Sequence, residues 1–140
     1  IHQVRYNLLE RQAEDGLFHV LSENGVGCIC FSPLAQGALT DKYLRGIPAG
    51  SRAAREGSTV AARYLDAETL GKIKKLNDIA RAGGMTLAQM ALAWILRRPE
   101  VTSVLVGASS TAQLDSSLAA LKLPPLGEDV RKEIRAALGQ

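Results

Sequence analysis

Residues 26–31 (VGCICF) form a continuous apolar run of strand length, with Gly25 before it and Pro33 shortly after it. A strand of this kind, apolar at nearly every position, is typical of a parallel sheet that is covered on both faces. Residues 2–9 alternate polar and apolar side chains like a strand, and residues 12–24 have apolar side chains at helical spacing before an Asn24-Gly25 stop. Strand, helix and strand predict a βαβ unit and an α/β fold.

Residues 32–63 contain repeated glycine and proline, which predicts a long loop with one helical turn around residues 41–44. Long loops inside a compact domain are usually functional. The elements expected after it are helices at 66–82, capped by Asp66, and at 86–97, a buried strand at 101–106, a helix at 111–120 with a possible Ser110 cap, a proline-bearing turn at 123–126, and a helix at 128–138.

This order contains only three strands. A parallel sheet normally has more, and each strand needs neighbours on both sides to satisfy its backbone groups. We therefore expect the chain to be part of a larger β/α array, whose open strand edges favour self-association.

The composition is that of a globular chain. With 140 residues, 46% of them hydrophobic, it has room for one domain with a core. No apolar stretch approaches the roughly 20 residues that a bilayer crossing needs, and the first residues do not resemble a secretion signal, so we expect no membrane span and a cytoplasmic location. The net charge of +3 is spread along the chain, which argues against nucleic acid and is compatible with a small anionic ligand.

Cys28 and Cys30 stand two residues apart in the apolar run, so a strand places both side chains on one face. A metal pair would need further ligands, and none is evident nearby, so buried thiols are the favoured interpretation. His2 and His19 have no carboxylate or metal-ligand spacing around them, and we interpret both as incidental.

Two segments follow strands on the side where α/β proteins place their sites. In residues 31–43, Phe31 offers a flat ring to an aromatic ligand, Ser32 and the backbone around Gly37 offer donors to an oxyanion, and Lys42 offers a charge to phosphate. The alternative is a plain turn beside a surface lysine.

In residues 107–117 a turn of small residues begins a helix, whose free N–H groups and positive dipole end suit a phosphate. Hydroxyl groups at Ser109 and Ser110 would complement such a ligand. The alternative here is an ordinary helix cap formed by Ser110.

The order and distance between these segments resemble the aldo-keto reductase superfamily, in the branch of the potassium-channel β subunits and the bacterial glyceraldehyde-3-phosphate reductase-like enzymes. The resemblance extends over essentially the whole chain, in the segments QVRYNLLER, FSPLAQGALTDKYLRGIPAGSR and MTLAQMALAWILRRPEVTSVLVGASSTAQL. It implies that the chain is the C-terminal portion, about strands six to eight with their helices, of a (β/α)8 TIM barrel that uses NADPH to reduce a small aldehyde or sugar-derived carbonyl compound.

The resemblance also implies a role for each matching position. Gln3 would hydrogen-bond the nicotinamide carboxamide and Phe31 would stack on its ring. The pyrophosphate would be wrapped by Ser32, Pro33, Leu34, Gln36 and Gly37. Lys42 and Arg52 would close over the phosphates and favour NADPH over NADH, while the adenosine side would lie against Gly107, Ser109, Gln113, Ser116 and Ser117.

Three positions in the second segment depart from the family pattern. Ser116 and Ser117 stand where the family usually has Glu and Asn, and Ser110 stands where Arg or Asn is common, so adenine contacts are expected to differ. Asp41 replaces the usual glycine of the first motif.

The catalytic residues of the superfamily, a Tyr proton donor with Lys, Asp and His, come from its first four strands. Tyr6, Tyr43 and Tyr64 belong to other motifs, so we expect this chain alone to be inactive. Two alternatives remain: a non-catalytic NADPH-sensing or scaffold module of the channel β-subunit type, and a self-associating half barrel.

Overall fold

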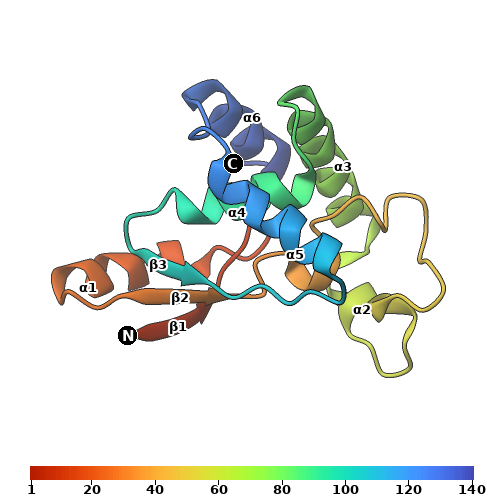
Figure 1. Ribbon diagram of the computed structural model, residues 1–140, viewed down its shortest axis with the longest axis horizontal. Helices are drawn as coiled ribbons and strands as arrows, with labels where there is room; N and C mark the ends of the chain where they lie inside the picture. The colour runs from red at the N-terminus through yellow and green to blue at the C-terminus, as the bar shows by residue number, and fades with distance from the viewer. The chain divides into compact units, whose positions relative to one another are not determined.

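A computed structural model describes all 140 residues (Figure 1). These residues form two compact units. The sheet unit comprises residues 1–33 and 89–126, and the helical unit comprises residues 34–88 and 127–140. Each unit therefore contains segments from both halves of the sequence.

The sheet unit is built on three parallel strands, β1 (His2–Arg5), β2 (Cys28–Phe31) and β3 (Val101–Val104), in the order β1-β2-β3. In the register of β1 with β2, Gln3 lies opposite Ile29 and Arg5 opposite Phe31. Between β2 and β3 the register shifts after Cys28. The prediction of an α/β fold with parallel strands is confirmed, and β1 and β3 form the edges of this sheet.

The helices of the sheet unit are α1 (Leu17–Glu23), α5 (Thr111–Leu118) and most of α4 (Leu87–Leu96), with short 3-10 helices at Gln12–Glu14 and Ala119–Lys122. The cap expected at Ser110 is confirmed, because its Oγ accepts a hydrogen bond from the Gln113 backbone N–H at 3.3 Å. That bond satisfies one of the free donors at the start of α5.

Two predicted elements at the start of the chain are shorter than expected. The strand expected over residues 2–9 ends at Arg5, because Asn7 and Glu10 exchange backbone hydrogen bonds of 3.1 Å and turn the chain. The helix expected over residues 12–24 is divided at Gly16, whose φ of 115° is incompatible with a right-handed helix.

Three further boundaries also differ. The strand expected over 26–31 begins at Cys28, and the strand expected over 101–106 ends at Val104, although Leu105 N still donates to Cys30 O at 2.8 Å. The helix expected over 111–120 becomes a 3-10 helix after Leu118. Such differences of a few residues are usual where hydrogen-bond ladders end.

The helical unit contains α2 (Val60–Tyr64), α3 (Ala67–Ala82) and α6 (Glu128–Leu138), with α6 against α3, and 3-10 helices at Ala35–Gly37 and Arg52–Ala54. Asp66 caps α3 as expected, accepting a hydrogen bond from Thr69 N at 2.9 Å. The long loop is confirmed as far as Thr59, but α2 was not expected. Its buried Val60 and Tyr64 stand four residues apart, and packing of these side chains stabilises a helix too short to form alone.

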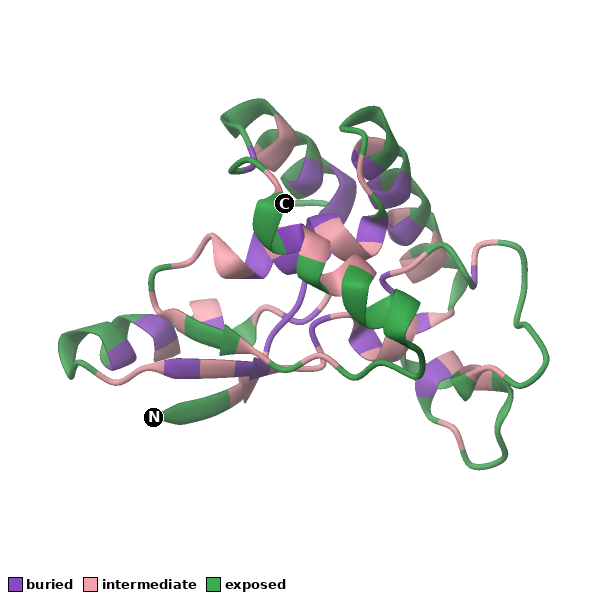
Figure 2. Cartoon of the chain, viewed as in Figure 1, coloured by how far each residue is buried: buried purple, intermediate pink, exposed green.

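Burial distinguishes the two faces of the central strand β2, along which buried and intermediate residues alternate (Figure 2). Cys28 and Cys30 are fully buried, which confirms the prediction for the thiols, whereas Ile29 and Phe31 are only half-buried. In β3 the side chains of Thr102 and Ser103 are exposed. The expectation of a sheet covered on both faces is therefore wrong for this chain, since only one face of its central strand is fully buried.

Tyr6 is at the centre of the buried side of the sheet unit. Its ring contacts Phe18 edge-on at 4.9 Å and stacks on Trp94 at 5.1 Å between ring centroids. Its hydroxyl donates to Glu14 Oε1 at 2.5 Å and accepts from Arg98 Nε at 3.3 Å. These contacts connect β1, the first 3-10 helix and the end of α4.

Candidate functional site

The carboxyl ends of β2 and β3 lie at the same end of the sheet, because the two strands are parallel neighbours (Figure 1). The chain leaves β2 at Ser32, and it leaves β3 through residues 105–110 before α5 begins. In open α/β sheets, ligands bind just beyond the carboxyl ends of the strands. The two segments that the sequence predicted as sites, residues 31–43 and 107–117, therefore start from the same end of the sheet.

The turn after β2 contains uncommon backbone conformations. Ser32, Ala35 and Gln36 have φ values of 53°, 47° and 57°. A residue other than glycine in this region costs about 1–3 kcal/mol, and such residues persist where the surrounding structure imposes them, often at binding sites. This turn therefore has the backbone character of a ligand-binding loop.

Within the helical unit, Lys42 folds back over the loop. The Leu34 carbonyl accepts hydrogen bonds from Gly37 N at 2.8 Å and Leu39 N at 3.1 Å, which close the loop. Gly37 has φ 98°, and a Cβ added there would lie 3.1 Å from Lys42 Nζ. The loop thus brings a cation against its own glycine, among the residues expected to hold phosphate.

Arg52 is exposed at the start of the second 3-10 helix. The backbone N–H of the next residue, Ala53, donates to the Tyr43 hydroxyl at 3.3 Å. This bond connects the short helix that contains Arg52 to the residue that follows Lys42. The two cations of the expected phosphate grip are therefore on connected segments of one unit.

In the turn before α5, two hydrogen bonds connect Ser109 to the side chain of Gln113. Gln113 Oε1 accepts from Ser109 N at 3.0 Å and from Ser109 Oγ at 2.9 Å. Ser117 Oγ donates to the Gln113 carbonyl at 3.0 Å, and the Ser116 carbonyl accepts from Gln89 Nε2 at 3.3 Å. Gly107, Ser109 and Gln113 are all exposed, so a ligand has access to this turn.

Gln3 and Phe31 lie on the less buried face of the sheet, because paired residues of parallel strands share a face and side chains alternate. Arg5 lies on the same face, and its guanidinium carbon is 5.0 Å from the centre of the Phe31 ring. Arg5 was not among the predicted site residues, although its spacing of two residues from Gln3 was a usable signal.

Asn7 was also missed. Its side chain is fully buried, and Nδ2 donates to the Ser32 carbonyl at 3.0 Å across 25 positions of sequence. No periodicity or motif in the sequence indicates this contact.

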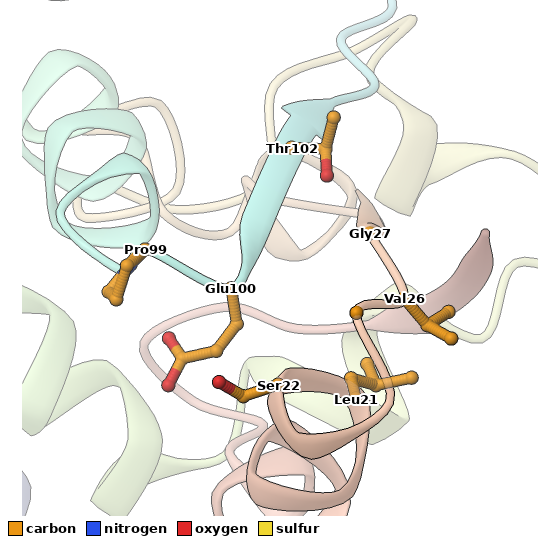
Figure 3. A pocket seen from close by; sticks show the side chains of 8 residues that line it. Leu21, Ser22, Val26, Gly27, Pro99, Glu100 and Thr102 are labelled. Carbon is orange, nitrogen blue, oxygen red and sulfur yellow. The ribbon is translucent and has the colours of Figure 1, made fainter.

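A hollow of about 270 Å³ lies at the amino-terminal end of β2 and β3, lined by residues that precede these strands and by Thr102 of β3 (Figure 3). The side chains of Ser22 and Glu100 point into it, and Glu100 Oε2 is buried without a hydrogen-bond partner. None of the fourteen residues expected to bind cofactor lines this hollow, which comprises Leu21, Ser22, Gly25, Val26, Gly27, Pro99, Glu100 and Thr102.

The structure contains no group of three or more His, Cys, Asp or Glu side chains arranged to hold a metal ion. No single helix is long and apolar enough to cross a membrane, although α3 and α4 taken together satisfy the criteria of length and composition.

The family model described as Aldo/keto reductase family matches residues 1–138. The chain belongs to the aldo/keto reductase family. Among aldo/keto reductase relatives, the chain is 50% identical to L-glyceraldehyde 3-phosphate reductase of Escherichia coli K12 over 125 residues, 86% of this chain and 36% of that protein. The resemblance found in the sequence is thereby confirmed at the level of the family.

Two further similar proteins are not named as reductases. A probable voltage-gated potassium channel subunit beta of Oryza sativa subsp. japonica is 41% identical over 129 residues, 90% of this chain and 39% of that protein. Protein tas of Escherichia coli K12 is 42% identical over 135 residues, 94% of this chain and 37% of that protein. This aldo/keto reductase chain thus spans less than two fifths of the length of the curated relatives it matches.

Proposed function

We propose that this chain is the cofactor-binding, carboxyl-terminal part of a (β/α)8-barrel oxidoreductase that reduces aldehydes or ketones with NADPH. The observation that supports this most is that the turn at Ser32 and the turn before α5 begin at the same end of the sheet, where β2 and β3 terminate side by side. In the proposal, each of these two turns binds one half of the dinucleotide. Membership of the aldo/keto reductase family supports the assignment of the whole protein as an oxidoreductase.

The geometry of the first turn fits the phosphates of NADPH. A Cβ at Gly37 would lie 3.1 Å from Lys42 Nζ, so a larger residue there would push the Lys42 side chain aside. In the proposal, backbone N–H groups of Ser32, Leu34 and Gln36 donate to the pyrophosphate, while the N–H of Gly37 keeps its bond to the Leu34 carbonyl and holds the loop closed. Pro33 has no N–H and fixes the path of the chain into the loop. Lys42 and Arg52 supply positive charge.

The second turn fits the adenosine end. Ser109 and Gln113 already form a hydrogen-bonded pair, and the exposed start of α5 offers free N–H groups and a positive dipole end. Ser116 and Ser117 lie one turn further along α5. Their short hydroxyl side chains reach less far than Glu and Asn, so we expect weaker contacts with adenine.

NADPH, when bound, supplies the hydride. The role of this chain is to orient the nicotinamide: Gln3 would hydrogen-bond the carboxamide, and Phe31 would present its ring as a platform. In the proposal none of the three tyrosines is the proton donor of the family pattern, and the burial of Tyr6, Tyr43 and Tyr64 is compatible with this. We therefore propose that the chain by itself does not catalyse reduction.

Titration of NADPH against the full-length protein, followed by cofactor fluorescence, tests this proposal. We expect saturable binding, and no change at millimolar cofactor would contradict it. An aldehyde-reduction assay on the 140-residue chain alone should show no turnover, and measurable turnover would refute the absence of the catalytic set.

The preference for NADPH over NADH tests the proposed cations. Lys42→Met and Arg52→Met remove charge and keep apolar length, so each should weaken NADPH binding about tenfold, the effect of one charge-assisted hydrogen bond. NADH binding should change less. An equal loss for both cofactors would place the cations away from the 2′-phosphate.

Each of the two alternative functions is supported by one observation. The similarity to a probable potassium channel subunit beta favours a non-catalytic NADPH-sensing or scaffold module, in which NADPH binds but no carbonyl compound is reduced. The edge positions of β1 and β3 favour a self-associating half barrel. Sedimentation velocity distinguishes the latter, because self-association predicts a sedimentation coefficient that rises with protein concentration.

A further inference from the structure

Asn7 lies just beyond the end of β1 and is fully buried. Its neighbour Tyr6 makes the last ladder contact of the strand, from Tyr6 N to Phe31 O at 3.4 Å. Asn7 is therefore beside the point where β2 ends and the chain turns at Ser32. A buried amide needs a full set of partners, and those partners show what the side chain does.

Every hydrogen-bonding position of the Asn7 amide is used. Oδ1 accepts from the backbone N–H groups of Leu9 at 2.9 Å and Glu10 at 3.0 Å. Nδ2 donates to Glu10 Oε2 at 2.8 Å and to the Ser32 carbonyl at 3.0 Å. The opposite orientation of the amide would place Oδ1 against two acceptors, so this orientation alone satisfies all four contacts.

One of these contacts reaches the strained turn. Ser32 has φ 53°, a conformation that only surrounding contacts can maintain in a residue other than glycine. The amide of Asn7 holds the carbonyl oxygen of that residue.

We propose that Asn7 is a positioning residue for the cofactor: its amide holds the Ser32 carbonyl and thereby keeps the turn into residues 34–42 in the conformation that binds phosphate. This inference rests on the proposed function of that turn. In this proposal Asn7 does not contact the cofactor itself, since its side chain is fully buried.

The expected effect follows from the population of the binding conformation. When only a fraction of molecules has the competent turn, the apparent dissociation constant rises by the inverse of that fraction. One buried hydrogen bond corresponds to a change of about tenfold in such an equilibrium. Loss of the Asn7 contact should therefore weaken NADPH binding by about this factor, with little change in kcat at saturating cofactor.

Asn7→Asp is the most conservative test, because it keeps the acceptor for Leu9 and Glu10 and replaces the donor with a second oxygen. The new carboxylate repels both the Ser32 carbonyl and the Glu10 carboxylate. The double variant Asn7→Asp with Glu10→Gln restores one of these contacts, since the Gln amide donates to the Asp oxygen. It leaves the Ser32 carbonyl without its donor.

The two variants separate positioning from folding stability. We expect the double variant to regain most of the melting temperature lost by Asn7→Asp, and to retain the tenfold increase in the dissociation constant and KM for NADPH. Asn77→Asp is the matched control, because it puts the same charge at another buried asparagine, on α3 and outside the turn. It should lower the melting temperature without changing NADPH affinity.

The outcomes are distinct. If the wild-type protein does not bind NADPH, the proposed function fails, and the role of Asn7 fails with it. If the wild type binds NADPH but Asn7→Asp binds it equally well, only the role of Asn7 is refuted. Recovery of both affinity and melting temperature in the double variant would also refute that role, because affinity would then follow stability.

Discussion

The guanidinium carbon of Arg5 lies 5.0 Å from the centre of the Phe31 ring, on the less buried face of the sheet. The register of β1 with β2 places the two residues directly opposite each other. Arg5 Nη1 is also 3.8 Å from Glu10 Oε2, so its charge is held near the end of β1. The ring proposed as the nicotinamide platform therefore has a cation beside it.

Replacement of Phe31 tests the platform. Phe31→Ala removes the ring, and we expect the dissociation constant for NADPH to rise about twofold to tenfold, since an aromatic stack contributes about 0.5–1.5 kcal/mol. Phe31→Trp keeps a flat ring and should bind within about twofold of wild type. Arg5→Met provides the comparison: if it weakens binding as much as Phe31→Ala, the cation rather than the ring is the important group.

The hydrogen bonds of Glu14 predict a loss of stability in acid. Burial alone would raise the pKa of Glu14, but hydrogen bonds from Arg11 and Tyr6 and the charges of Arg11 and Arg98 outweigh burial and lower the pKa below its ordinary value of 4.5. A carboxyl group with a lowered pKa stabilises the folded state above the pKa of the unfolded chain, and this stabilisation is lost as pH falls through the folded value.

We therefore expect the free energy of unfolding to decrease as pH falls below about 4.5, and Glu14→Gln to flatten this part of the profile. Urea unfolding of both proteins between pH 3 and 7 measures the difference. Identical slopes would show that other carboxyl groups cause the acid loss.

We expect the two thiols to be unreactive, because both are buried. Burial raises the pKa of Cys30 to about 12, and it raises the pKa of Cys28 as well. Because the thiolate is the nucleophile, a thiol-specific reagent at pH 8 should label neither cysteine in the folded protein and both in guanidinium chloride. Rapid labelling of either thiol under native conditions would contradict the burial of that face of β2.

Gly27 packs closely against β3. A Cβ at this position would lie 2.5 Å from Thr102 Oγ1, an atom that accepts a hydrogen bond from Cys28 N at 3.2 Å. Gly27→Ala should therefore lower the free energy of unfolding by about 1–3 kcal/mol. Gly71→Ala is the matched control, because nothing lies within 4 Å of a Cβ there and α3 should gain about 0.5–1 kcal/mol. Chemical denaturation measures both, and equal effects would show that Gly27 has room.

The elements that the sequence predicted well are those whose signals are local. Asp66 begins α3 and Ser110 begins α5 because a side-chain oxygen satisfies an N–H group only three residues away. The shared face of Cys28 and Cys30 follows from the two-residue repeat of a strand. The family could also be identified from the sequence, since the order of its motifs is a property of the chain itself. The cofactor roles of residues in those motifs remain predictions.

Contacts between distant segments could not be predicted in this way. The tertiary structure alone shows that Asn7 holds the Ser32 carbonyl, that Arg5 lies on Phe31, and that packing of Val60 stabilises α2. Each depends on strand register and on side chains brought together across many residues, and neither periodicity nor composition encodes these distances. Local hydrogen-bonding rules let the sequence determine where helices begin and which face of a strand holds the thiols. The tertiary fold decided which side chains meet at the carboxyl ends of the strands.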